Sequence, residues 1–322
     1  MRATRRGLDF VYAVATKPEN FRVFGHDFLL CFYIISNTAR DSELRRRARE
    51  MGIERAREWR RAHAEVPASA DAADVKNLTI GSYSAEQLGF PDAHFKELLR
   101  QAARRFSARD FLKFDAPVEP PRDLAPRPGS SDDGPGGRSR YDVYLDALIC
   151  TYFGDAYGIT LGASYKDVIR WLPAMRPYPA RNTTDEETFH DALGAVAHVV
   201  YTLDGYTNCK IAGNLLPQEF VFLESNLTTA IERKDPEILG EFLDTLKAFG
   251  LDESDEVIRN GESYLLSTQN ADGSWGDTET KDVYERYHTT WTAVDGLREY
   301  LWNGRELRST TLLPSPQPTR ER

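Results

Sequence analysis

The chain has 322 residues, of which 41 are basic and 50 acidic, so its formal net charge at pH 7 is −9. This balance disfavours a protein that binds nucleic acid through the phosphate backbone, because such binding needs a net basic surface. Hydrophobic residues make up 41% of the chain and aromatic residues 11%, which is enough to fill a large core and excludes an intrinsically disordered chain.

The longest apolar run, Phe28–Ile35, is well short of the roughly 20 residues that a membrane-spanning helix needs, so no membrane span is expected. The apolar stretch Val11–Ala15 near the N-terminus is not followed by a small-residue cleavage site, so no export signal is expected. Three widely separated cysteines, Cys31, Cys150 and Cys209, are typical of reduced thiols. These features predict a cytoplasmic protein.

Apolar-rich stretches of helix length recur along the chain, and the alternation typical of strands is nearly absent. Asp185, Pro236 and Gly250 stand where helix caps are expected. The pattern therefore predicts an all-α fold. In chain order, the predicted helices are Asp27–Ser36, Tyr141–Tyr152, Thr188–Tyr201, Glu219–Ile231, Glu237–Phe249 and Val257–Thr268.

Two segments have the composition of irregular chain. Residues 115–140 carry six prolines and four glycines, too many for a packed helix, and predict a flexible insertion. Residues 309–322 are rich in proline and polar side chains and predict a disordered tail. The remainder, residues 1–308, is predicted to form a single domain.

A glycine with apolar or aromatic neighbours recurs between predicted helices. From Gly158 to Gly296 the intervals are 45 to 47 residues, and the longer gap before Gly158 contains the predicted insertion. A period of this length fits a repeated helix hairpin, with about six copies in the chain, although so many glycines could also produce it by chance. Such hairpins form either an open solenoid or a closed ring.

A local motif favours the closed ring. Gln269, Gly273 and Trp275 follow the predicted helix Val257–Thr268 as Gln-x-x-x-Gly-x-Trp. This resembles the repeat of the superfamily of terpenoid cyclases, such as squalene-hopene cyclase, and protein prenyltransferase β-subunits. The resemblance implies an α/α-toroid, in which helix hairpins close into a barrel. Locally, the glutamine can cap backbone groups, the glycine permits a sharp turn, and the tryptophan can pack over the next hairpin.

The segment 282–297 is similar to the last inner helix of a protein prenyltransferase β-subunit. It contains Tyr287, His288 and Thr289, and in that family the histidine of Tyr-His-Thr is a zinc ligand. The Asp-x-Cys pair that completes the zinc site in the family does not occur here, nor do the Asp-x-Asp-Asp and Asp-Asp-x-x-Asp motifs of the cyclases. We therefore expect no metal and no cofactor.

Five residues are predicted to act as catalytic groups. His198 and Tyr201 share one face of a predicted apolar helix that also carries His190. Asp146 lies among apolar residues of another predicted helix, and His288 lies on the inner helix that the resemblance implies. A buried histidine near tyrosine and carboxylate groups suits general acid–base catalysis. The open alternative for each histidine is a core side chain satisfied by a backbone carbonyl.

Five more residues are predicted to bind substrate. Arg170 and Arg176 lie in a segment broken by prolines and could bind an anionic group, unless this segment is a solvated loop. Arg286, Tyr287 and Trp291 accompany His288 on the implied inner helix and are expected to line the same site.

These observations predict a metal-independent enzyme of specialised metabolism, a lyase or cyclase of natural-product biosynthesis. It would catalyse ring closure, or elimination of an anionic leaving group, on a small-molecule substrate that bears an anionic group. One alternative is a non-catalytic toroid that binds a partner protein or a lipid-like ligand. A second is a metal-dependent transferase or hydrolase that uses His288 with carboxylates. A partner protein or homo-oligomer remains open.

Overall fold

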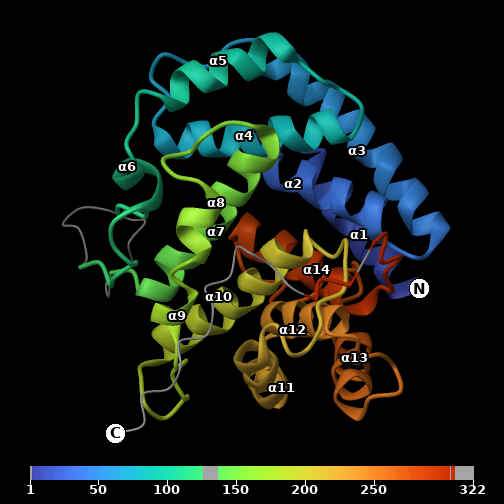
Figure 1. Ribbon diagram of the computed structural model, residues 1–322. Coiled ribbons are helices and arrows are strands. Elements are labelled where there is room, and N and C mark those ends of the chain that lie inside the picture. The colour runs from blue at the N-terminus through green and yellow to red at the C-terminus, as the bar shows by residue number, and fades with distance from the viewer. Residues whose placement is uncertain (1, 126–136, 305, 309–322) are drawn as a thin grey trace, which may run out of the picture.

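The computed structural model describes residues 2–125, 137–304 and 306–308 (Figure 1). Within these ranges the regular structure is helical, and β-type contacts are limited to isolated bridges. The predicted all-α class is therefore confirmed. In the same ranges, no helix combines the length and the apolar character needed to cross a bilayer. The predicted insertion at 115–140 lies partly outside the described residues, and the predicted tail at 309–322 lies wholly outside them.

Six long helices contact one another in a closed cycle, in which the last also contacts the first (Figure 1). Most of the other helices pack against one or two members of this cycle. This is the order of contacts that an α/α-toroid would have, and the toroid itself stays a prediction. The helices of the cycle are α2 (Pro18–Thr38), α4 (Ala72–Gln87), α7 (Arg140–Tyr157), α10 (Glu186–Asp204), α12 (Pro236–Ala248) and α14 (Val283–Leu297). The other described helices are α1 (Arg2–Ala15), α3 (Ser42–Ala62), α5 (Ala93–Ala103), α6 (Ala108–Leu112), α8 (Tyr165–Ile169), α9 (Leu172–Met175), α11 (Pro217–Glu232) and α13 (Glu256–Thr268).

All six stretches predicted as helices from the sequence lie in helices, and the predicted caps are present. The Asp185 carboxylate accepts a hydrogen bond from the backbone N–H of Thr188 at 2.8 Å. Pro236 is the first residue of α12, where its missing N–H costs no helical hydrogen bond. Gly250 follows the same helix with a φ of +100°, a conformation that favours glycine.

The recurring glycines mark helix ends only in part. Four of them have positive φ angles directly after helices of the cycle, as the hairpin prediction requires: Gly89, Gly158, Gly205 and Gly250. Gly52 instead lies inside α3, and Gly296 lies inside α14. For these two the prediction of a hairpin turn is wrong, and each fits its helix because a neighbour packs closely against it.

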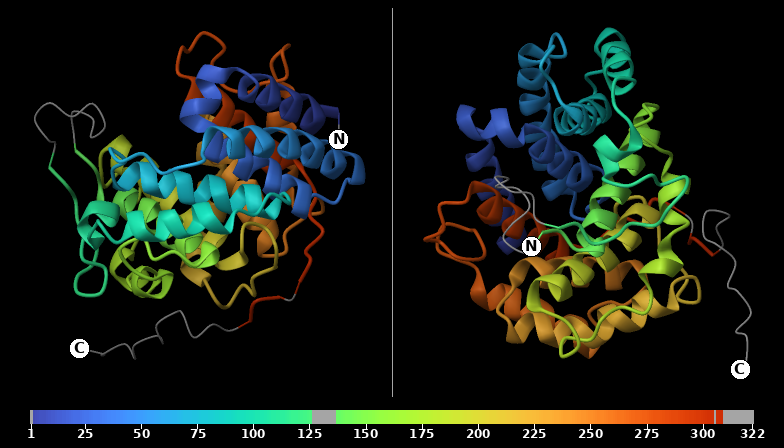
Figure 2. Two further views of the ribbon diagram at one scale, coloured as in Figure 1. Left: turned by 90° about the horizontal axis from the view of Figure 1, so that it is seen from above. Right: turned by 90° about the vertical axis from the view of Figure 1, so that its left-hand side faces the viewer.

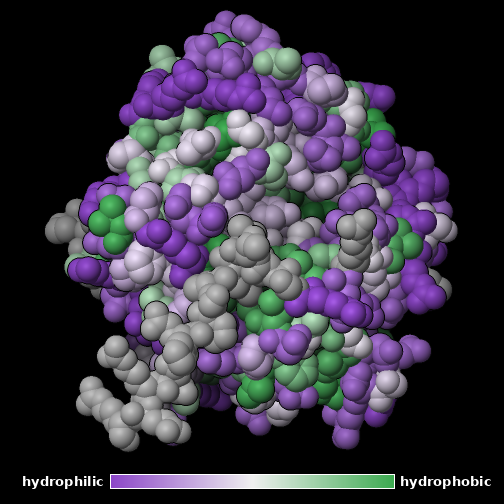
Figure 3. All heavy atoms as spheres, in the orientation of Figure 1, coloured by the Kyte–Doolittle hydropathy of each residue, from purple (hydrophilic) through white to green (hydrophobic). Residues whose placement is uncertain are grey.

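The charged helix α3 lies on the outside of the molecule. The Arg46 side chain is 55% exposed and forms ion pairs with Glu43 and Glu50, one turn away on either side. Hydrophilic side chains also dominate the face drawn in Figure 3 along α3 and α5. Exposed pairs of this kind contribute little to stability, typically well under 1 kcal/mol, so α3 depends on its buried side.

The Gln-x-x-x-Gly-x-Trp motif joins the two ends of the chain. The Gln269 amide donates to the backbone oxygens of Ala3 and Gly273, both at 2.9 Å. Arg6 donates in return to the Gln269 side-chain oxygen at 3.1 Å. Trp275 is 1% exposed, and its indole N–H donates to a backbone oxygen of α13. Figure 2 shows α1 beside α14, so the motif stabilises the closing contact, in which the first helix of the chain packs against the last helix of the cycle.

This closing contact predicts a difference between two glycine-to-alanine variants. Gly273 and Gly250 have φ angles of +95° and +100°, so alanine costs about 1–2 kcal/mol of backbone strain at either position. A Cβ at Gly273 would also lie 2.7 Å from the backbone oxygen of Arg6, whereas nothing lies within 4 Å at Gly250. We expect Gly273→Ala to lose about 2 kcal/mol more unfolding free energy than Gly250→Ala in urea titrations. Equal losses would contradict a tightly packed closing contact.

Candidate functional site

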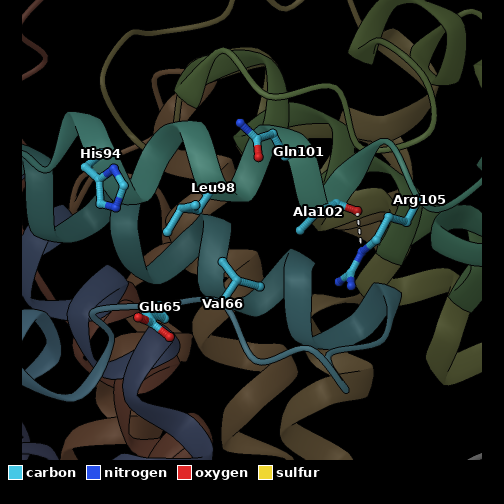
Figure 4. A pocket seen from close by; sticks show the side chains of 7 residues that line it. All are labelled: Glu65, Val66, His94, Leu98, Gln101, Ala102 and Arg105. Carbon is cyan, nitrogen blue, oxygen red and sulfur yellow. Dashed lines mark hydrogen bonds between the residues drawn. The ribbon is translucent and has the colours of Figure 1, made fainter.

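One hollow of the described chain lies outside the cycle of helices (Figure 4). It has a volume of about 360 Å³ and lies between α5 and the chain that follows α3. Leu98 and Ala102 of α5 line it, and its charged members Glu65, His94 and Arg105 are exposed. It lacks the buried titratable groups that an active site uses, whereas such groups lie inside the cycle.

Two smaller cavities lie inside, between helices of the cycle. The central cavity, about 50 Å³, is lined by residues of α2, α10, α12, α14 and the turn after α10: Ile34, His198, Tyr201, Tyr206, Thr207, Glu241, Asp244, His288, Trp291, Thr292 and Asp295. The second cavity, about 140 Å³, shares Ile34 and Tyr206 with it. Its other lining residues are Tyr33, Asn37, Thr38, Tyr83, Tyr152, Phe153, Gly205 and Asn208.

A pair of glycines brings α12 and α14 into backbone contact beside the central cavity. A Cβ at Gly240 would lie 2.3 Å from the backbone oxygen of Thr292, and a Cβ at Gly296 would lie 2.8 Å from the Gly240 Cα. Neither position therefore has room for any other residue. The close approach lets short carboxylate side chains of α12 reach the side chains of α14.

Glu237 and His288 form an ion pair between these two helices. The His288 Nδ1 lies 2.8 Å from one carboxylate oxygen of Glu237, and the Thr289 hydroxyl donates to the other at 3.0 Å. Burial lowers the pKa of His288, but the Glu237 carboxylate outweighs it and raises that pKa to about 9. Burial likewise raises the pKa of Glu237, but His288 outweighs it and holds that pKa at about 2. Both groups are therefore charged at pH 7.

His198 is the neutral histidine of the central cavity. Its Nδ1–H donates to the backbone oxygen of Gly194 at 3.0 Å, which assigns the lone pair to Nε2. Burial lowers the pKa of His198 to about 4, against the opposing effect of the Gly194 hydrogen bond. The Tyr201 ring lies perpendicular to the imidazole at 5.4 Å between centroids, and burial raises the pKa of this tyrosine well above its usual value. An imidazole in this state can accept a proton at neutral pH.

Two carboxyl groups of α12, which the sequence analysis missed, complete the cavity. Glu241 is 4% exposed, and burial together with the charge of Glu237 raises its pKa to about 8. Asp244 is 1% exposed, and burial together with Asp295 raises its pKa to about 7. The sequence did contain a signal for them: Glu237, Glu241 and Asp244 are spaced four and three positions apart along an otherwise apolar helix. Residues at these spacings share one helix face.

Two other predicted catalytic residues lie near the cavity without lining it. The His190 Nε2 is 3.4 Å from Asp235, and its side chain is 43% exposed. Asp146 is 38% exposed and pairs with Arg138 at 2.5 Å. The charge of Asp146 acts to raise the pKa of His198, and His190 acts to lower that of Glu241. Both residues therefore influence the cavity through electrostatics.

The residues predicted to bind substrate separate into two groups. Trp291 lines the central cavity. Tyr287 is fully buried, and its hydroxyl donates to Asp27 of α2 at 2.7 Å, so it connects two helices of the cycle.

The three predicted arginines do not line either cavity. Arg170 donates to backbone oxygens of the chain after α6. Arg176 forms a two-bond pair with the buried Glu219 of α11, and Arg286 pairs with Asp272 at 3.0 Å. Each guanidinium thus has a structural partner within the chain. The structure brings together His198, His288, Tyr201 and Trp291, and adds Glu237, Glu241 and Asp244.

Comparisons of the chain with family models, curated proteins and solved structures find no match. Over the described part of the chain, no three histidine, cysteine, aspartate or glutamate side chains are grouped so that they could hold a metal ion.

The Glu237–His288 pair predicts a change in the charge of a histidine. In Glu237→Gln the main group that raises the pKa of His288 is gone and burial dominates, so we expect a neutral His288 at about pH 7.5 instead of a cationic one. Histidine-selective NMR titration of the imidazole measures this. Glu253→Gln, at an exposed position before α13, is the control and should leave His288 cationic.

The same pair sets a pH dependence of stability. The pKa of His288 is raised from 6.5, so its contribution is full below about pH 6.5 and is lost as the pH rises through about 9. The pKa of Glu237 is lowered from 4.5, so its contribution is full above about pH 4.5 and is lost as the pH falls towards 2. The unfolding free energy of the wild type relative to Glu237→Gln should therefore fall between pH 7 and 9. A constant difference over that interval would contradict the assignment.

Proposed function

We propose that the protein is a small-molecule enzyme that catalyses elimination or ring closure by acid–base chemistry in the central cavity. One observation carries this proposal: a neutral imidazole, His198, and a carboxyl group that is largely protonated at pH 7, Glu241, line the same cavity. When two titratable groups in one site have pKa values shifted in opposite directions, one can act as the base and the other as the acid at the same pH.

The elimination step uses both groups. The His198 Nε2 takes a proton from a substrate carbon, the electrons of that C–H bond form the new double bond, and the bond to the leaving group breaks. Glu241 gives its proton to the leaving group, which departs as a neutral molecule. In ring closure, His198 takes the proton from the attacking heteroatom and Glu241 protonates the atom that accepts the electrons. The imidazolium then returns a proton to the carboxylate, so the cycle balances.

The Glu237–His288 pair supports this step electrostatically. His288 keeps a positive charge at pH 7 and lines the central cavity, so it can stabilise negative charge that develops as the substrate loses its proton. This differs from the expectation of an anionic leaving group held by arginines, because Arg170, Arg176 and Arg286 pair elsewhere. Protonation by Glu241 takes the place of arginine binding in the proposal.

The wider assignment is also part of the proposal. The closed cycle of helices and the closing contact at Gln269 support membership of the toroid superfamily of terpenoid cyclases and protein prenyltransferase β-subunits. The three free cysteines, of which Cys31 and Cys150 are buried, support a cytoplasmic location. The proposal includes a role in specialised metabolism.

The test is a search for turnover that depends on both groups. Purified protein is incubated with a small-molecule extract in D₂O buffer, and mass spectrometry follows compounds that disappear, appear or gain deuterium. We expect at least one compound to be converted to a product of equal mass or of a mass lower by one small neutral molecule. His198→Gln and Glu241→Gln should slow this conversion by roughly 10²–10⁴-fold.

His94→Gln is the matched control, because His94 is an exposed histidine beside the outer hollow of Figure 4. It should convert the same compound at the wild-type rate. Conversion that survives both His198→Gln and Glu241→Gln would overturn the proposed function. A compound that binds the wild type without any conversion would instead favour the non-catalytic toroid.

A further inference from the structure

Two buried carboxyl groups of the central cavity have oxygens without a partner. Oε2 of Glu241 and Oδ1 of Asp244 make no hydrogen bond within the described residues, and both side chains line the cavity. A buried polar atom without a partner costs about 1–3 kcal/mol, so native structures seldom retain one without a function. Two such oxygens, against one unpartnered donor of the described chain at the same cavity, the indole N–H of Trp291, indicate a ligand that chiefly donates hydrogen bonds.

The cationic side chains near these carboxyl groups are already paired. His288 pairs with Glu237 at 2.8 Å, and the buried Arg298 pairs with Asp295 at 2.6 Å. Lys247 pairs with Glu262 at 2.7 Å and also donates to the backbone oxygen of Gly296. Among the described residues, no cation near the cavity is therefore free to balance Glu241 and Asp244 when they ionise, which favours a ligand that brings a positive charge.

Aromatic rings surround the same space. Trp291, Tyr201 and Tyr206 line the cavity, and the two tyrosine rings stack at 5.8 Å between centroids with an angle of 14°. The negative faces of such rings attract organic cations, and the attraction grows when the cation is removed from water. A wall of rings with two carboxyl oxygens suits an alkylammonium group better than a hydrated metal ion.

The volumes of the two cavities indicate which part of a ligand each one can hold. About 50 Å³ in the central cavity holds only a few non-hydrogen atoms, such as an ammonium group and its first methylene. The second cavity adjoins it at Ile34 and Tyr206 and offers about 140 Å³ lined by tyrosines, a phenylalanine and neutral amides. This lining carries no side chain of fixed charge and combines aromatic rings with hydroxyl and amide groups, so it suits a neutral body that also forms hydrogen bonds.

We propose that the central cavity binds the ammonium group of an organic amine, with Glu241 and Asp244 as hydrogen-bond acceptors and the second cavity as the site of the amine's neutral body. This inference rests on the proposed function only in making the amine the product: Glu241 gives its proton to the leaving group, and the carboxylate that remains pairs with the ammonium group. Binding itself needs no turnover. The ligand class has the opposite charge to the one expected from the sequence.

Binding of the amine should release protons from the protein. The carboxyl groups are neutralised by burial, and a bound cation favours their charged form, so protons should be released at pH 7. The titratable and charged neighbours of the two groups are His190, His198, Tyr201 and Asp204 on α10, Asp235, Glu237 and Lys247 on α12 and its cap, His288 and Asp295 on α14, and Arg298 and Tyr300 after α14.

The test is calorimetric titration of the full chain at pH 7 with three probes of similar shape: butylamine, 1-butanol and butanoate. We expect butylamine to bind at least tenfold more tightly than 1-butanol, and butanoate to give no binding heat. Titrations in two buffers with different ionisation heats should show proton release with butylamine alone. Potassium chloride at equal concentration should not compete with butylamine.

Glu241→Gln and Asp244→Asn replace protonated carboxyl groups by neutral groups of the same shape, so both variants should fold, which circular dichroism checks. Each should weaken butylamine binding at least tenfold and remove its share of the proton release, whereas the exposed Glu253→Gln should not. Equal binding of amine and alcohol, competition by potassium, or undiminished binding in both cavity variants would overturn the proposal. Amine binding without conversion of any compound would contradict the proposed function alone.

Discussion

The backbone contact between α12 and α14 at Gly240 and Gly296 is the constraint on which the site depends. Two helices can approach this closely only where side chains are absent, and larger residues at these positions would force them apart. At this separation the carboxylate of Glu237 reaches the imidazole of His288 at 2.8 Å, and the cavity beside them has a volume of about 50 Å³. The chemistry proposed for the cavity follows from this distance.

The interior holds many ionisable groups, and the fold tolerates them in three ways. Glu237 and His288 stay charged because each is the other's counterion. His198 and Glu241 avoid the cost of buried charge by being neutral, which leaves one a base and the other an acid. Asp295 is stabilised by Arg298, a buried guanidinium that also donates to a hydroxyl of α2. Such groups reduce stability relative to an apolar core, so their grouping around one cavity favours a functional origin.

Local features could be predicted from the sequence because local interactions produce them. The cap at Asp185 and the turn at Gly273 each depend on a few neighbouring residues, and both are present. His198 and His288 could be proposed as candidates because polar side chains on apolar helices are conspicuous. The turn predicted at Gly52 from the glycine period is wrong, because the sequence alone does not distinguish a glycine required for close packing from one required for a turn.

Pairing between distant segments could not be predicted in the same way. Arg176 was a reasonable candidate for an anion site, but its partner, Glu219, lies on another helix and no local pattern links them. Glu241 and Asp244 were overlooked because acidic residues on a helix usually face water, and only the position of α12 in the cycle buries them. The charge state of a site therefore depends on which helix faces meet, and a single sequence does not specify that.

The central claim is that a protonated carboxyl group lies beside a neutral imidazole at pH 7. Infrared difference spectroscopy between wild type and Glu241→Gln tests this most directly, because the C=O stretch of a protonated carboxyl group differs from that of a carboxylate. The account predicts that the wild type shows the protonated band at pH 7, that the variant lacks it, and that it disappears as the pH rises through about 8. A carboxylate band at pH 7 in its place would contradict the account.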